Sequence, residues 1–203
     1  MYKHIFTAVA ACLLIPIAAL SVHMTPSASP KTPAAPEVSA AQPAPEANAQ
    51  ELGAVKARLS QLLKLNRVFD DCMDSDRVLI EEAATVLLDQ AVDTPSGDRV
   101  INQQSVLTFI KDLYGKEADP VAGKYDFLPA PEGYFAIPAR GYDTYTHEIE
   151  NLRVLENGDV TVLSDMTVET HDGDTFQMRV VTLFRPNAAS PFGYNILRAD
   201  IVQ

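Results

Sequence analysis

The last sixty residues of this 203-residue chain constrain its fold more than any other part of the sequence. Between Thr144 and Val202 lie four segments of about ten residues with the composition of β-strands: YTHEIENLRVL, VTVLSDMTVET, DTFQMRVVTLF and GYNILRADIV. Asn157-Gly158 and Asp172-Gly173 stand at the first two joints, and such dipeptides are the strongest short-range hairpin signals. The pattern predicts a four-strand antiparallel meander with strands long enough to curve around a helical side.

The first 21 residues have the organisation of a secretory signal peptide. A short polar start is followed by an apolar run from Ile5 to Leu20, with Ala19 and Ser21 at the small-residue positions that signal peptidase reads. The run has 16 residues, fewer than the ~20 that a membrane-spanning helix needs. We expect a cleaved signal, or else an uncleaved membrane anchor at residues 5–20, and in both cases an extracytoplasmic protein that is periplasmic or secreted.

Residues 22–50 differ in composition from the rest, because 17 of these 29 positions are Ala, Pro or Ser. Such a segment buries too little apolar surface to offset its ordering entropy, so we expect a disordered linker or tail. Residues 51–203 are long enough for one domain around one core, and they carry 14 Lys and Arg against 25 Asp and Glu. This excess of acidic residues argues against nucleic acid as a partner.

Helical periodicity predicts three helices ahead of the meander: Glu51–Met73, a shorter helix to about Ala84, and Val100–Tyr114. Asp74-Ser75-Asp76 breaks the first helix and offers an N-terminal cap for the second. Gly115 is placed to end the third helix. Thr85–Val92 is compatible with a continued helix or with a strand, and its β-branched residues favour a strand.

Residues 116–143 contain four prolines, three glycines and five Tyr or Phe residues, which is unusual for a loop. Two hypotheses follow from this composition. The segment is a binding loop in which Tyr125 and Tyr134 contact a ligand, or its aromatic side chains hold an irregular segment against the sheet.

The order of helix, short helix, strand, helix and four-strand meander resembles the nuclear transport factor 2-like superfamily, which includes ketosteroid isomerases and SnoaL-like cyclases. The local likeness lies in the Gly158-Asp159-Val160 strand start, the Phe176–Phe184 strand and the final Gly193–Ala199 segment. The resemblance implies an α+β fold: N-terminal helices on a strongly curved antiparallel sheet of four to six strands, a cone-shaped roll. It also implies a pocket on the concave face and, often, dimers formed through the outer face.

Two-residue hairpin turns would determine which residues pair across the strands. Glu150 would then lie opposite Asp165, and Asp165 opposite Val180, with all three side chains on one face. Two carboxylates among apolar neighbours cannot both ionise cheaply, so one would act as a general base or as a neutral donor. Residues predicted to line this pocket as ligand contacts are Leu152, Leu163, Phe176, Met178 and Val180.

A bulge near Asn151 is the alternative, because it would shift the register and turn Glu150 toward water. The opposite face would carry His147 and Arg179 among apolar side chains. If that face points away from the helices, its apolar side chains need another protein surface to cover them, which predicts a homodimer. If it faces the helices, it lines the pocket and His147 is a candidate base.

No pattern in the sequence indicates a metal site, a cofactor site or a nucleophile elbow. We therefore expect an exported, non-catalytic binding or scaffold domain for a small apolar ligand or a protein partner. The alternatives are an isomerase- or cyclase-type enzyme that uses a pocket carboxylate or His147, and a periplasmic component of a secretion or conjugation assembly.

Overall fold

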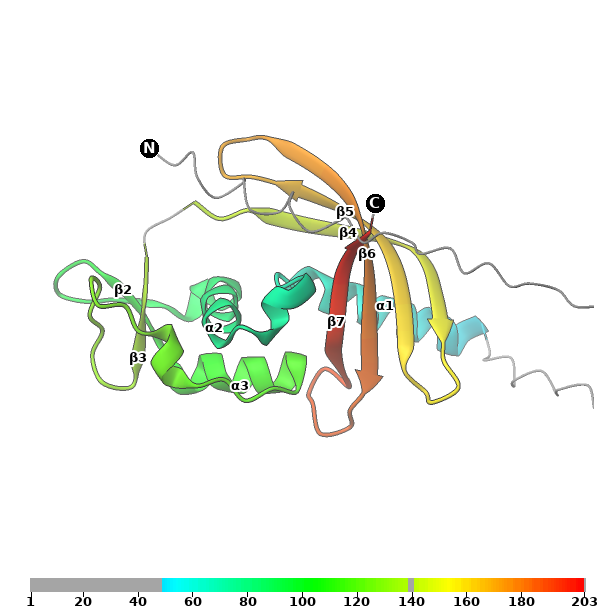
Figure 1. Cartoon of the computed structure of the whole chain (residues 1–203), viewed down its shortest axis with the longest axis horizontal. Coiled ribbons are helices and arrows are strands. Elements are labelled where there is room, and N and C mark those ends of the chain that lie inside the picture. Colours follow the sequence, from blue (N-terminus) through cyan, green and yellow to red (C-terminus); the bar gives the residue numbers. More distant parts are fainter. Residues whose placement is uncertain (1–48, 139–140, 203) are drawn as a thin grey trace, which may run out of the picture. The chain divides into compact units, whose positions relative to one another are not determined.

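A computed structural model describes residues 49–138 and 141–202 of the chain (Figure 1). The predicted signal peptide or anchor and nearly all of the predicted linker lie outside these described residues. Within the described ranges, no helix combines the length and apolar composition needed to cross a membrane.

The four-strand meander is confirmed, and with it the α+β class. The sheet has the order β4-β5-β6-β7 with every pair antiparallel, and it curves as Figure 1 shows. Its strands are β4 (Thr144–Val154), β5 (Val160–Glu169), β6 (Thr175–Pro186) and β7 (Tyr194–Val202).

In the described residues, three α-helices precede this sheet, together with three short 3-10 helices. The α-helices are α1 (Ala49–Leu65), α2 (Asp76–Val86) and α3 (Gln103–Tyr114), and the 3-10 helices are η1 (Asp70–Asp74), η2 (Leu88–Gln90) and η3 (Pro120–Gly123). The predicted caps are confirmed. Ser75 Oγ accepts a hydrogen bond from the backbone of Val78 at 3.4 Å, and Gly115 ends α3 with a φ of 66°.

The first helix is shorter than predicted, because it ends at Leu65 and not at Met73. Asn66 is fully buried, and its Oδ1 accepts the Tyr114 hydroxyl at 3.1 Å and the backbone of Val68 at 3.4 Å. An asparagine that bonds to nearby backbone competes with the helical ladder. A tertiary contact from α3 therefore holds the chain in a non-helical turn at this point.

A second, three-stranded sheet was not predicted. Its order is β1-β2-β3, with β1 (Val92–Asp93), β2 (Arg99–Asn102) and β3 (Tyr134–Ile137). The predictions of a helix from Val100 and of a strand over Thr85–Val92 are therefore wrong in part. Val100 and Ile101 are buried strand residues, and two adjacent apolar residues fit a helix and a strand equally well.

The register of the long sheet differs from the prediction because both tight turns hold three residues, not two. Leu155 pairs with Asp159, and Thr170 with Asp174, through backbone hydrogen bonds of 2.8 Å. Gly158 and Gly173 have φ of 84° and 88°, whereas Asp70 is the only non-glycine residue with positive φ in the described part of the chain. This is a type I turn followed by a glycine bulge, which adds one residue to each hairpin.

The core lies between the helices and one face of the long sheet, which we call the inner face. Val162, Met166, Val180 and Phe184 of this face are at most 1% exposed. They belong to one apolar cluster with the buried leucines of α1 and the buried side chains of α3. The other face, which we call the outer face, carries mainly polar and charged residues.

Candidate functional site

Two rows of polar side chains cross the outer face on adjacent strands. Thr146, Thr167 and Gln177 form one row, and Glu148, Asp165 and Arg179 form the other, as the strand pairing requires. Together they line an open groove with a volume of about 570 Å³. His147 and Met178 also line the groove, although both belong to a row of the inner face that lies between the two polar rows along the strands. This groove is larger than the pocket between α2 and β3 that is described below.

Arg179 organises the charges beside the groove. Its Nη2 contacts Glu150 Oε2, and its Nε lies 3.4 Å from Asp165 Oδ1. The hydrogen bond and the charge of Glu150, followed by those of Asp165, raise the pKa of the Arg179 guanidinium above its ordinary value. The side chains are one-third to one-half exposed, so these ion pairs orient the groups and add little to stability.

The predicted pairing of Glu150 with Asp165 is wrong. Glu150 is the bulged residue between Ile149 and Asn151 and has no partner on β5, while Asp165 faces Glu148 on one side and Arg179 on the other. The bulge alternative is therefore the correct one. Both carboxylates lie on the outer face beside an arginine, and neither lies in an apolar pocket.

Of the five sheet residues predicted as ligand contacts, four share the inner face and one lies on the outer face. Val180 is fully buried in the core, whereas Phe176 is 46% exposed near the start of β6. Leu152 and Met178 pack at the margin of the core, and Leu163 lies in the outer-face row between Asn151 and Val181. A one-residue change of register exchanges the two faces of a strand, which is why Leu163 of β5 is separated from the other four residues.

His147 lies on the inner face, in the row with Met166 and Met178. Its Nδ1 is 3.1 Å from the hydroxyl of the fully buried Ser164, and its Nε2 is buried with no hydrogen-bond partner among the described residues. Burial lowers the pKa of His147 to about 4. The imidazole is therefore neutral at pH 7, and the lowered pKa also makes it a weaker base than an exposed histidine.

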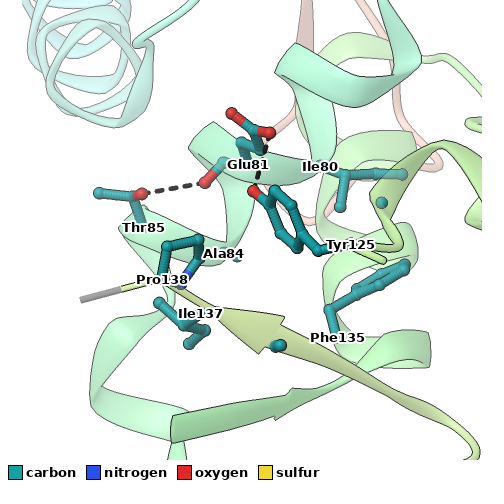
Figure 2. Close-up of a pocket in the computed structure, with 10 residues that line it drawn as sticks. Ile80, Glu81, Ala84, Thr85, Tyr125, Phe135, Ile137 and Pro138 are labelled. Atoms are coloured by element: carbon teal, nitrogen blue, oxygen red, sulfur yellow. Dashed lines mark hydrogen bonds between the residues drawn. The ribbon is translucent and has the colours of Figure 1, made fainter. Parts of the chain in front are cut away.

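Tyr125 lines a small pocket between α2 and β3, which Figure 2 shows. Its hydroxyl donates to Glu81 Oε1 at 2.8 Å, and Glu81 also receives Arg77 Nε at 2.9 Å. The cavity volume is about 10 Å³, which is close to the space of one water molecule. The pocket has no room for an organic ligand in this conformation, and Tyr134 does not line it.

Sequence reasoning missed four groove residues: Thr146, Glu148, Thr167 and Gln177. The signal was present as alternating polar positions on β4, β5 and β6. With hairpins of three residues and a bulge at Glu150, that alternation places all four on one face. In the described part of the chain, no cluster of three or more His, Cys, Asp or Glu side chains is arranged to hold a metal.

Comparisons with family models, with curated proteins and with solved structures find no match to this chain. Any functional assignment therefore depends on the geometry of the groove and of the partly buried His147.

Proposed function

We propose that this protein is an extracytoplasmic, non-catalytic binding or scaffold domain that engages a protein partner through the outer-face groove. The observation that carries this proposal is the open groove of about 570 Å³ lined by two rows of polar side chains. Its hydroxyl, amide and carboxylate groups suit hydrogen bonds to another chain, and its open form suits a protein surface better than an enclosed small molecule.

A small apolar ligand is a weaker form of the same proposal. Such a ligand would lie against the inner face, where buried side chains of the sheet such as Met166 and Phe184 already pack in one cluster with Leu59 of α1. Close-packed side chains leave little space for a guest unless the core rearranges. The groove itself has few apolar groups to offer.

The negative charge of the groove and of the chain indicates which kind of partner surface would bind there. Glu148 has no hydrogen-bond or ion-pair partner among the described residues, and Asp165 is about half exposed. The whole chain carries a net charge of −11. A partner with exposed lysine or arginine side chains would be steered to this surface and would find unpaired carboxylate oxygens there.

We also propose that the chain is a member of the nuclear transport factor 2-like superfamily and that it takes part in an exported assembly. The order α1, α2, short hairpin, α3 and four-strand meander supports the family relationship. The addition of β3 to that hairpin is a departure from the predicted pattern. Because one superfold supports scaffolds as well as enzymes, the relationship alone does not select a function.

The test is site-specific photo-cross-linking of the full chain in cells. A benzoylphenylalanine residue at Thr167, inside the groove, should yield a defined cross-linked partner that mass spectrometry identifies, and Glu148→Lys should weaken that product. Thr161 is the matched control, because it lies on the outer face of the same strand but outside the groove. Equal products from both positions, or none from Thr167, would contradict the proposal.

A second candidate is an isomerase- or cyclase-type enzyme with His147 as general base. The neutral imidazole, its hydrogen bond to Ser164 and its unpartnered Nε2 favour it. A base that substrate reaches must also be open to a small reagent, so diethyl pyrocarbonate separates the two functions. Under the binding proposal, His147 should react far more slowly than the exposed His171; comparable rates would favour the enzyme.

A further inference from the structure

The two edges of the long sheet differ in what covers them. β7 forms one edge, where the backbone N–H of Ile201 donates to Asp70 Oδ1 at 3.0 Å. Asp70 makes this contact at a φ of 52°, in the left-handed region that residues other than glycine rarely adopt. A carboxylate from outside the sheet therefore closes the β7 edge at this position.

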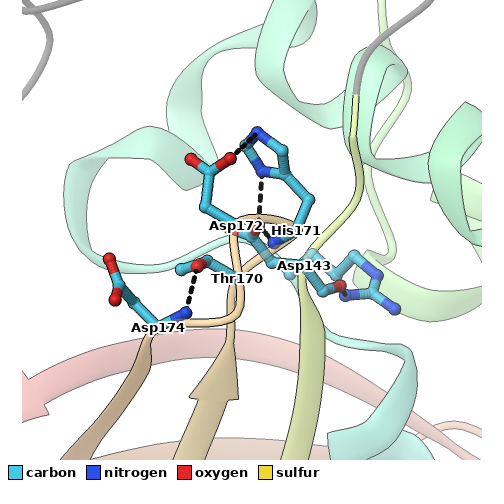
Figure 3. A network of polar contacts seen from close by, with 6 residues as sticks. Asp143, Thr170, His171, Asp172 and Asp174 are labelled. Carbon is cyan, nitrogen blue, oxygen red and sulfur yellow. Dashed lines mark hydrogen bonds and ion pairs between the residues drawn. The ribbon is translucent and has the colours of Figure 1, made fainter.

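β4 forms the other edge, and the second hairpin shows which of its backbone groups face outward. The backbone N–H of Thr170 donates to the backbone oxygen of Asp174 at 2.8 Å, and the N–H of Asp174 donates to Thr170 Oγ1 at 3.1 Å (Figure 3). Backbone groups alternate in direction along a strand, so even-numbered residues of β5 bond to β6 and odd-numbered residues bond to β4.

His147 and Ile149 consequently direct their backbone groups toward the free edge. They pair with even-numbered residues of β5, whereas Glu148 between them pairs with the odd-numbered Asp165 and bonds to β5. Among the described residues, no backbone or side-chain group hydrogen-bonds to the N–H or C=O groups of His147 and Ile149. This part of the edge therefore offers backbone donors and acceptors to another strand.

The outer-face row that reaches this edge ends on an uncompensated carboxylate. Glu148 lies opposite Asp165, and Asp165 lies opposite Arg179. Arg179 contacts both Asp165 and Glu150. Glu148 is exposed and has no ion pair among the described residues. Like charges directly opposite one another on a sheet are destabilising, so the position beside Glu148 on an added strand suits lysine or arginine.

The side chains that face the helices at this edge are less polar. Ile149 is 7% exposed and belongs to the core cluster, and His147 lies on the same face of β4. Residues of an added strand on this side would extend the inner face, which suits apolar side chains. The β-bulge at Glu150 ends the regular part of the edge, so the added strand would pair with residues 144–149.

We propose that an extended segment of a protein partner, with alternating basic and apolar residues, adds to the β4 edge as a further strand. Backbone hydrogen bonds give such addition its affinity, and alternate side chains give it specificity. This inference rests on the proposed function, because Thr146 and Glu148 of the same strand line the groove. A second copy of this chain also carries a net charge of −11, so a basic segment fits the edge better.

Amide-resolved hydrogen exchange of the full chain by NMR tests the open edge. The amides of His147 and Ile149 should exchange more than about tenfold faster than that of Glu148, which is bonded within the sheet. Ile201 on the opposite edge is the matched control. Its amide should be protected, and Asp70→Gly, which allows the same φ but removes the carboxylate, should make it exchange quickly. Equal protection of His147 and Glu148 would overturn the inference.

A synthetic peptide of alternating lysine and valine, blocked at both ends, is the probe for the added strand. It should slow exchange at His147 and Ile149 by about tenfold or more and leave Thr146 and Glu148 unchanged. N-methyl groups on the valines alone, or on the lysines alone, each block one edge of the peptide strand, so only one of these two peptides should lose the effect. Glu148→Lys should weaken it.

No protection by the unmethylated peptide, or an equal result with both methylated peptides, would overturn the inference. Protection of His147 that increases with the concentration of the chain alone would show a second copy on the edge and would overturn it as well. The proposed function fails separately, because Thr167 would then yield no cross-linked partner although the peptide still protects the edge.

Discussion

At the scale of single residues, the two groups with the clearest electrostatic environments lie on opposite faces of the same sheet. Arg179 lies on the outer face between two carboxylates, which stabilise its charge. His147 lies on the inner face, where burial disfavours its charge. The outer residue therefore suits recognition of another molecule, and the inner one couples the stability of the fold to pH.

The pH dependence of stability follows from the lowered pKa of His147. An unfolded histidine takes up its proton near pH 6.5, but His147 in the folded chain does so only near pH 4. In this window the unfolded state binds more protons, so the free energy of unfolding should decrease as the pH falls from about 6.5 toward 4. Urea denaturation at pH 7.5 and pH 5 measures the decrease.

His147→Gln removes the titrating group, so the decrease between these two pH values should be smaller in that variant. His171→Gln is the control, because its ring lies among carboxylates at the surface and its loss should not reduce the acid sensitivity that His147 causes. An identical decrease in wild type and His147→Gln would show that other groups determine the acid response.

At the scale of elements, the glycine bulges of the two hairpins decide which face each strand presents. Each bulge adds one residue to its loop, and side chains alternate with a period of two. The groove residues and the core residues are thereby assigned to separate faces. The β-bulge at Glu150 then shifts β4 by one further residue and places Glu150 next to Arg179.

Gly173→Ala should lower the free energy of unfolding by about 1–2 kcal/mol, because Gly173 has a φ of 88° in the left-handed region. Gly53→Ala is the matched control, since both positions are exposed and neither has an atom within 4 Å of the added Cβ. Gly53 lies inside α1, where alanine should raise stability by about 0.5–1 kcal/mol. Chemical denaturation gives both values, and a change of the same sign in both variants would contradict this explanation.

At the scale of the whole folded unit, packing and charge are separated between the two faces of the long sheet. The inner face joins the helices in one apolar cluster, and this burial supplies most of the stabilising free energy. The outer face keeps hydroxyl, amide and charged groups in contact with solvent. The homodimer that the sequence analysis expects through an apolar outer face stays a prediction, and the outer rows that line the groove are polar.

The sequence by itself determined the features that depend on a few neighbouring residues. The four long strands, the positions of the tight turns, the Ser75 cap and the Gly115 helix end are all local, because three or four residues contain the necessary signal. The α+β class followed from the order of these elements. This part of the prediction is confirmed.

Only the tertiary structure decided the register, the length of α1 and the pairing of β3 with β2. Asn157-Gly158 is compatible with a two-residue or a three-residue hairpin, and the choice between them depends on which strand faces can be buried against the helices. Likewise, the end of α1 depends on a hydrogen bond between Asn66 and Tyr114, which are 48 positions apart. The candidate site could not be read from the chain because it depends on this register, which long-range packing determines.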